Sequence, residues 1–122
     1  MKILVTDDSR MARKMLIKTL SEVLGENFEL SEAQDGEEAV NLYKENSFDI
    51  VFLDLTMPVM DGFTALELIK NHDNSAKIVV VSADIQKAAV DKVLELGALS
   101  FIKKPIDSQK MQQIFEKLNN KR

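Results

Sequence analysis

Acidic, hydroxyl and basic side chains follow four apolar segments of this chain, at the point where each segment ends. Asp7 and Asp8 follow the first segment, Asp54 follows the third, Ser82 ends the fourth and Lys104 follows the fifth. Carboxylate ligands without histidine or cysteine favour a hard cation such as Mg²⁺. A carboxylate can also attack phosphorus, and phosphoryl transfer then needs positioning and charge neutralisation, which a metal ion, a lysine and a hydroxyl supply. If the fold brings these residues together, they suit phosphoryl transfer to an aspartate.

Strand and helix patterns alternate along the chain and would place these residues. Strands are expected at Lys2–Thr6, 28–33, 49–54, 77–83 and 99–102. Helices are expected at 9–24, with Met11, Ala12, Met15, Leu16, Leu20, Val23 and Leu24 on the inner face, and at 35–46. Three later helices are marked by Phe63, Leu66 and Ile69, by Ala89, Val93 and Leu96, and by Met111, Ile114, Phe115 and Leu118. Strict alternation predicts an α/β fold whose parallel sheet has helices on both faces.

The carboxyl ends of the strands in such a sheet are where functional groups collect. If the strand order is 2-1-3-4-5, the first and third strands are neighbours, and three carboxylates meet in one crevice. Three acids repel one another, and a bound divalent cation would explain the cluster. The alternative is that Asp7 and Asp8 only cap the first helix. That alternative leaves Asp54 and Lys104 at the matching strand ends unexplained.

Length and composition exclude several classes of protein. The 122 residues predict a single domain over 1–122 with an ordinary globular composition, 45% hydrophobic and 30% charged. The chain has no cysteine and one histidine, His72, which excludes disulfides and sites built from thiolates or several histidines. A net charge of −4 without a basic tract gives no sign of nucleic-acid binding. The absence of cysteine fits the cytoplasmic location that we expect, and no apolar run approaches a membrane span of about 18 residues.

These residues stand in four short segments: VTDDSR after the first strand, DLTMPVMDG after the third, VSA at the end of the fourth and FIKKP at the fifth. Together the segments resemble the receiver domain of two-component response regulators, the CheY-like family. Each segment alone is a weak signal, but their order along essentially the whole chain is highly specific. The resemblance implies a flavodoxin-like (βα)5 fold with strand order 2-1-3-4-5.

The resemblance also implies a phosphoacceptor and a set of metal ligands. Asp54 would accept a phosphoryl group from a histidine kinase in a Mg²⁺-dependent reaction. Asp7 and Asp8 would hold Mg²⁺, with Asp8 as a direct ligand. Asp54 and the backbone carbonyl of Thr56 would complete the protein ligands. The chain would catalyse only its own phosphorylation and dephosphorylation, and would act as a signalling switch.

Five further roles follow from the same resemblance. Lys104 would pair with the phosphoryl group, and the peptide bond after it would be cis. Ser82 would turn toward a phosphoryl oxygen, and Phe101 would be the aromatic switch that follows it, with plain core packing as the alternative. The side chains of Thr56 and Asp84 would lie at the rim and tune attack by water on the phosphate. For these two, a solvated loop position is the alternative.

A downstream protein is expected to bind the face made by the fourth helix, the fifth strand and the fifth helix, and a phosphatase is a further expected partner. The candidate contact residues on that face are Lys87, Val90, Asp91, Leu94, Lys103 and Ile106. A stand-alone regulator of the chemotaxis type is favoured, because nothing in these residues forms an output domain. A phosphorelay intermediate, or a receiver excised from a longer regulator, is the alternative.

Three other classes share part of the pattern. A phosphatase of the haloacid dehalogenase type needs a second aspartate two residues after its nucleophile, where this chain has Thr56. A flavodoxin needs a hydroxyl-rich phosphate loop after the first strand, where Asp7 and Asp8 would repel the phosphate of FMN. A pseudo-receiver, a binding module that is never phosphorylated, stays open, although the complete set of site residues disfavours it.

Overall fold

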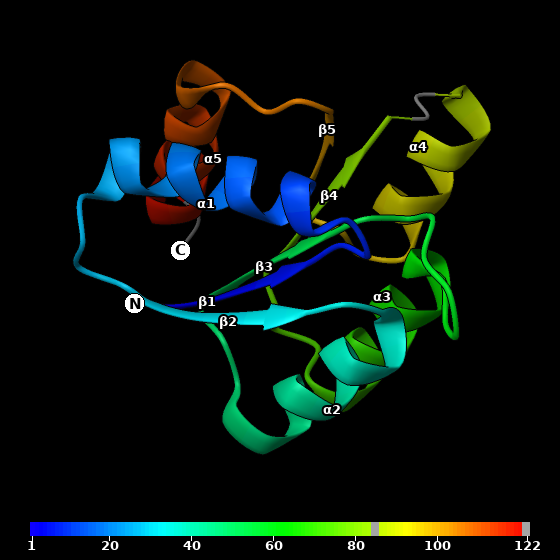
Figure 1. The fold of residues 1–122 in the computed structure, drawn as a ribbon. Helices are drawn as coiled ribbons and strands as arrows, with labels where there is room; N and C mark the ends of the chain where they lie inside the picture. The colour runs from blue at the N-terminus through cyan, green and yellow to red at the C-terminus, as the bar shows by residue number, and fades with distance from the viewer. Residues whose placement is uncertain (84–85, 121–122) are drawn as a thin grey trace.

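The structure, a computed structural model, describes residues 1–83 and 86–120. Its strands are β1 (Lys2–Thr6), β2 (Glu29–Ala33), β3 (Ile50–Leu53), β4 (Ile78–Ser82) and β5 (Ser100–Lys103). Its helices are α1 (Arg10–Leu24), α2 (Gly36–Asn46), α3 (Gly62–His72), α4 (Lys87–Glu95) and α5 (Ser108–Asn120). Strand and helix alternate from β1 to α5, as the sequence predicts (Figure 1).

The strands form one parallel sheet in the order β2-β1-β3-β4-β5. This is the flavodoxin-like arrangement, so the predicted fold class and strand order are confirmed. β1 lies between β2 and β3, with Leu4 opposite Val51 and Thr6 opposite Leu53. Because neighbouring parallel strands run in register, the segments after β1 and β3 leave the sheet at the same edge.

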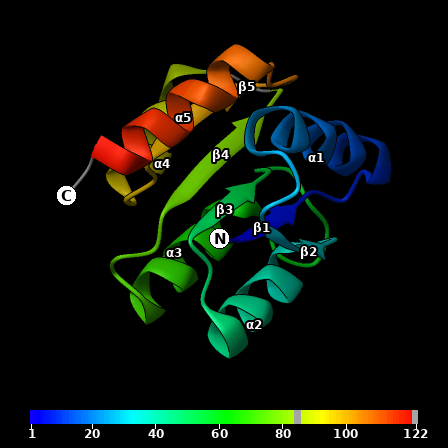
Figure 2. The same ribbon diagram turned by 90° about the vertical axis from the view of Figure 1, so that its left-hand side faces the viewer.

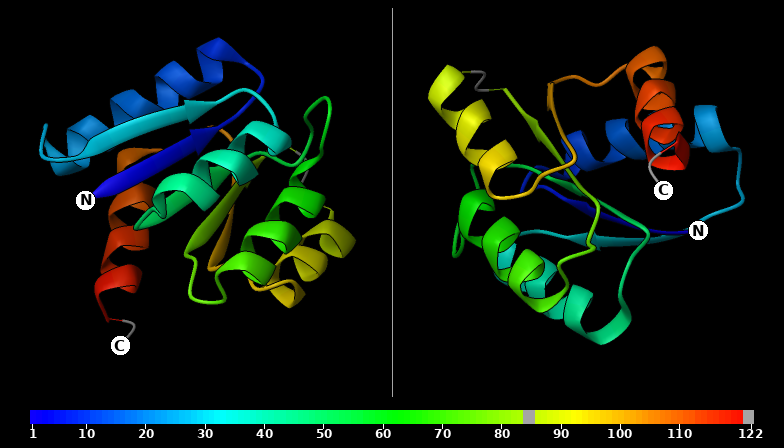
Figure 3. Two further views of the ribbon diagram at one scale, coloured as in Figure 1. Left: turned by 90° about the horizontal axis from the view of Figure 1, so that it is seen from below. Right: turned by 180° about the vertical axis from the view of Figure 1, so that it is seen from behind.

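Two groups of helices cover the sheet. α1 and α5 pack together on one face, over a core that includes Leu20 and Met111. α2 and α3 lie side by side on the other face, and α4 joins the same core through Val93. Figure 2 shows the sheet between α1 and α5 on one side and α2 and α3 on the other, and Figure 3 shows the α2–α3 pair from below.

Two of the three interior strands of the sheet are buried along their whole length. Every residue of β3 and of β4 is buried, which suits strands covered by helices on both faces. The edge strands β2 and β5 are more exposed. β3 therefore holds the residue that follows it, Asp54, in a fixed position.

The predicted inner face of α1 is partly wrong. Met11 and Met15 are 68% and 52% exposed, and the buried stripe of the helix is Arg13, Leu16 and Leu20. These three residues recur at the three- and four-residue spacing of one helix face, and the two methionines lie beside that face. Such exposure is ordinary, because the interior of a protein is mostly apolar but a large part of its surface is apolar too.

None of the helices among the described residues is both long enough and apolar enough to cross a membrane.

Candidate functional site

The backbone of the sheet brings Asp7 and Asp54 side by side. The N–H of Asp54 donates to the carbonyl of Thr6 at 3.0 Å, and the N–H of Asp7 donates to the carbonyl of Ala33 at 3.1 Å. These bonds continue the strand pairing one residue past the ends of β3 and β1. Asp54 and Asp7 are both buried, at 6% exposure each, at the carboxyl edge of the sheet.

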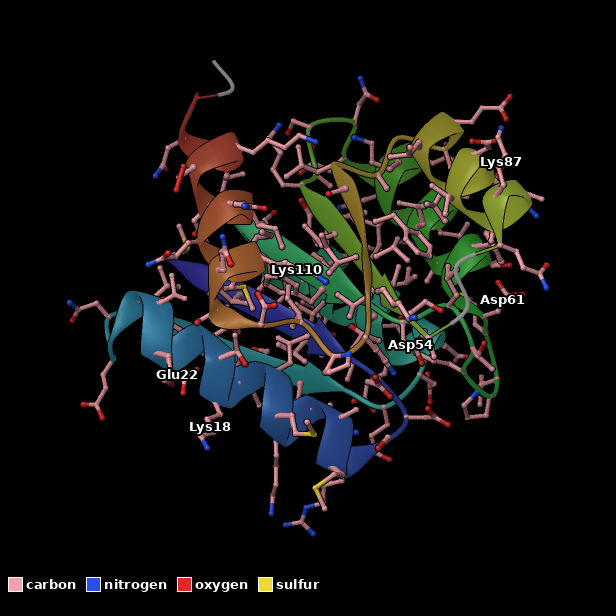
Figure 4. All side chains as sticks on the ribbon, turned by 90° about the horizontal axis from the view of Figure 1, so that it is seen from above. Lys18, Glu22, Asp54, Asp61, Lys87 and Lys110 are labelled. Atoms are coloured by element: carbon pink, nitrogen blue, oxygen red, sulfur yellow. The ribbon has the colours of Figure 1, made fainter. Side chains whose placement is uncertain are left out.

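Three carboxylates meet at this edge, as the strand order predicts. One carboxylate oxygen of each of Asp7, Asp8 and Asp54 lies within 4.8 Å of the other two. Asp8 is exposed while the other two are buried, so the cluster opens to solvent on one side. Figure 4 shows Asp54 where the strand ends give way to the loops. A donor set made only of oxygen atoms, with an open side, fits Mg²⁺.

Lys104 makes contact with two of these carboxylates. Its Nζ lies 2.6 Å from Asp7 Oδ2 and 3.5 Å from Asp54 Oδ2. The preference for Asp7 was not predicted. Burial disfavours the charged ammonium, but its hydrogen bond to Asp7 and the charge of Asp54 outweigh burial, so the pKa of Lys104 is raised. The peptide bond between Lys104 and Pro105 is cis, as the resemblance implies.

The carboxyl group of Asp54 is held in an environment that disfavours its charge. Burial and the nearby carboxylate of Asp7 raise its pKa, and they outweigh Lys104 and the N–H of Leu55, which act in the opposite direction. That N–H donates to Asp54 Oδ1 at 2.9 Å. An added cation would relieve the same repulsion, which is a physical reason for a metal at this site.

We expect Asp54→Asn to stabilise the metal-free protein at neutral pH by about 1 kcal/mol. Folded Asp54 binds its proton more tightly than the unfolded chain does. Its contribution to stability is therefore present below its ordinary pKa of 3.8 and is lost as the pH rises through the raised pKa. Urea unfolding in a chelator at about pH 7 and about pH 4 measures the difference, which should disappear in acid.

The matched control for this prediction is Glu67→Gln, which removes an exposed carboxylate of α3 that is not part of the cluster. It should change stability little at either pH. An Asp54→Asn protein that is less stable than wild type at neutral pH would contradict the prediction.

The remaining predicted site residues are Ser82, Thr56, Phe101 and Asp84. Ser82 is buried at the end of β4, and its carbonyl accepts the backbone N–H of Lys104 at 2.9 Å, which fixes these two strand ends to each other. Thr56 is exposed in the loop after β3. Phe101 is partly buried and packs against the core under α2, α3 and α4. Asp84 lies outside the described residues.

Sequence reasoning missed Arg13, which belongs to the surroundings of the site. This residue is 8% exposed, its Nη1 donates to the carbonyl of Asp7 at 2.6 Å, and its Nε donates to Glu32 Oε1 at 2.9 Å. The sequence held one signal that could have revealed it. Arg13 stands three residues before Leu16 and seven before Leu20, which places it on the same buried stripe of α1.

The alternative that Asp7 and Asp8 cap α1 is wrong. The N-cap is Ser9, whose Oγ accepts the N–H of Ala12 at 3.1 Å. Asp7 Oδ1 instead accepts the N–H of Ser9 at 2.9 Å. Ser9 suffices as a cap because serine is among the preferred residues at this position, which leaves Asp8 available to another partner.

Five of the six candidate residues on the α4–β5–α5 face are exposed or partly exposed. Lys87 and Asp91 form an exposed salt bridge of 2.9 Å, and Leu94 is 47% exposed. The expectation for Ile106 is wrong. Its side chain is 7% exposed and packs into the core on the α1–α5 side, because the loop after β5 turns toward α1.

The comparisons with known proteins agree with this fold and site. The model of the response regulator receiver domain matches residues 3–116. The chain therefore belongs to the response regulator receiver family, whose members are signalling switches of two-component systems.

Within that family, the chain is similar to CheY proteins. It is 40% identical over 120 residues to the chemotaxis protein CheY of Bacillus subtilis, with 98% of each chain covered. It is 42% identical over 113 residues to CheY of Treponema pallidum, with 90% of this chain and 76% of the relative covered. A solved relative is the CheX–CheY–BeF3–Mg²⁺ complex from Borrelia burgdorferi, with a TM-score of 0.89, 38% identity, and coverage of 98% and 90%.

Proposed function

We propose that residues 1–122 act as one receiver domain that accepts a phosphoryl group from a histidine kinase on Asp54. One Asp54 oxygen attacks phosphorus, and the bond from phosphorus to an imidazole nitrogen of the kinase breaks. The donor histidine, protonated on its other ring nitrogen, keeps the electron pair of that bond and leaves as neutral imidazole. The observation that carries the proposal is the position of Asp54 at the end of a buried strand, within 4.8 Å of two further carboxylates and 3.5 Å from Lys104.

Mg²⁺, held by Asp7, Asp8, Asp54 and the backbone carbonyl of Thr56, would neutralise charge that develops on the phosphoryl oxygens. The carboxylate cluster supports this ligand set. A CheY relative was solved with Mg²⁺ and BeF3, which also supports it. Lys104 is already near Asp54 Oδ2, so its ammonium can pair with the phosphoryl group.

The switch follows from the charge that phosphorylation adds, about −1.5 to −2 at neutral pH. Ser82 and Lys104 would move toward the new oxygens, and Phe101 would follow into the space released by the loop after β4. The α4–β5–α5 face would then change its affinity for a downstream protein. Thr56 and Asp84 would tune loss of the phosphate, with or without a phosphatase.

A chemotaxis-type role in the cytoplasm is favoured by the similarity to CheY proteins. A phosphorelay intermediate and a receiver that belongs to a longer regulator are the alternatives within the same family. A pseudo-receiver that binds partners without phosphorylation is the alternative of another class.

The test is the intact mass of the protein after incubation with a small phosphodonor such as acetyl phosphate. Wild type should gain one phosphoryl group in Mg²⁺ and none in a chelator, and Asp54→Ala should gain none in either. A gain that persists in Asp54→Ala would place the acceptor elsewhere. No gain in wild type would favour the pseudo-receiver.

A further inference from the structure

Arg13 is a buried cation that the proposed phosphoryl-transfer mechanism does not use. It stands on the inner stripe of α1 among apolar residues, where an unpaired charge would be costly. The guanidinium is paired on two sides, with the carbonyl of Asp7 at 2.6 Å and with Glu32 Oε1 at 2.9 Å. It therefore joins α1 to the ends of β1 and β2, beside the carboxylate cluster.

The bond to Asp7 completes the restraint of that residue. The N–H of Asp7 donates to Ala33, its Oδ1 accepts the N–H of Ser9, and its Oδ2 contacts Lys104. The carbonyl of Asp7 is the remaining polar group, and Arg13 Nη1 donates to it. Both the backbone and the side chain of Asp7 are thus fixed.

The same bond reaches Asp8, because the carbonyl of Asp7 belongs to the peptide group that joins the two aspartates. Holding this oxygen fixes the plane of the peptide and with it the direction in which the chain presents Asp8. Asp8 is exposed and stands at the open side of the cluster. Its approach to a metal ion therefore depends on the peptide that Arg13 holds.

We propose that Arg13 is a positioning residue of the metal site, which sets Mg²⁺ affinity by holding the Asp7–Asp8 peptide and is itself oriented by Glu32. The proposal rests on the proposed function, since it assumes that the cluster binds Mg²⁺. Groups that hold metal ligands in this way commonly change metal affinity by about 10- to 100-fold when they are replaced.

Electrostatic repulsion alone predicts the opposite change in Mg²⁺ affinity when Arg13 is replaced. A guanidinium near the cluster repels Mg²⁺, so its removal should strengthen metal binding if charge were all that mattered. If Arg13 acts by holding the Asp7–Asp8 peptide, its removal should weaken Mg²⁺ binding. The direction of the change therefore separates the two effects.

The experiment is calorimetric titration of Mg²⁺ into wild type, Arg13→Met, Arg13→Lys and Leu20→Ala. Arg13→Met keeps much of the side-chain volume, and its Kd for Mg²⁺ should rise about tenfold or more. Arg13→Lys keeps the charge but lacks the planar fork, so it cannot make both bonds in the same geometry and should give an intermediate Kd. It also serves as the folded test protein if Arg13→Met does not fold.

Leu20→Ala controls for loss of stability in the same helix. Leu20 is fully buried and apolar, so its truncation should cost about 2–5 kcal/mol of stability. Its Kd for Mg²⁺ should stay within about twofold of wild type, since the peptide between the aspartates keeps its support.

Three results would overturn the proposal. An unchanged or lower Kd in the Arg13 variants, with Mg²⁺ binding in wild type, would make Arg13 a purely structural residue and leave the proposed function intact. An equal rise of the Kd for Mg²⁺ in Leu20→Ala would show that the weaker binding comes from lost stability of the protein. Absence of Mg²⁺ binding in wild type would overturn the proposed metal site, and this inference with it.

Discussion

Gly62→Ala is expected to destabilise the protein by about 3 kcal/mol, at the upper end of the cost of overpacking. A Cβ atom at position 62 would clash with the carbonyl oxygen of Asp54 and would lie 2.7 Å from the Cα of Leu55. Both neighbours are backbone atoms, so no side chain can turn away to make room. The N–H of Gly62 also donates to the carbonyl of Leu55 at 2.8 Å, which holds α3 against this segment.

The same substitution should slow phosphorylation by a small phosphodonor by about 100-fold, because the segment that must move carries the nucleophile. Urea unfolding and the rate of mass gain measure the two effects. Thr64→Ala, at an exposed position in the first turns of α3, is the control and should change both little. A stable Gly62→Ala protein with normal phosphorylation would show that α3 shifts freely relative to β3.

Lys104→Met is expected to destabilise the metal-free protein at neutral pH by about 2 kcal/mol. This is less than the cost of removing one partner from a fully buried ion pair. Lys104 is 26% exposed, and its ammonium contacts Asp7 and Asp54, which are both buried. Its loss leaves the two carboxylates without that cation, and they repel each other more strongly. Saturating Mg²⁺ should recover most of the stability, because the metal supplies the missing positive charge.

The pH dependence of this effect follows from both partners. The raised pKa of Lys104 means that its contribution is fully present below the ordinary lysine pKa of 10.5 and is lost as the pH rises through the raised value. In acid the contribution also fades, because protonated carboxyl groups no longer need a cation. Lys103→Met, at the exposed neighbouring position, is the control. A loss of stability in Lys104→Met that is equal at neutral and acidic pH would show that lost packing, and not lost charge, is its cause.

The elements that place the carboxylates could be predicted because their sequence signals are local. The apolar segments that became β3 and β4 are buried throughout, and Gly25 stands directly after α1. Strand order was less accessible, since pairing between β1 and β3 joins residues far apart in the chain. Only the resemblance to receiver domains supplied that order.

The parts of the site that could not be predicted depend on where side chains turn after the chain has folded. Arg13 and Ser9 illustrate this. Arg13 occupies the buried stripe of α1, and Ser9 takes the cap position that the alternative interpretation gave to Asp7 and Asp8. The contact of Lys104 with Asp7 likewise depends on a competition between two nearby carboxylates, which spacing cannot decide. The exposure of Met11 shows that an apolar residue near a buried stripe need not join it.

The exposed methionines of α1 have a practical consequence for spectroscopy. Met11 and Met15 lie at the surface, Met57 and Met60 lie in the loop after β3, and Met111, which belongs to α5, is fully buried. Methyl labelling of methionine would thus distribute reporters over the surface, the loop beside Asp54 and the core. In one spectrum, signals from Met57 and Met60 that shift while Met111 stays constant would distinguish a change confined to the loop from loosening of the whole protein.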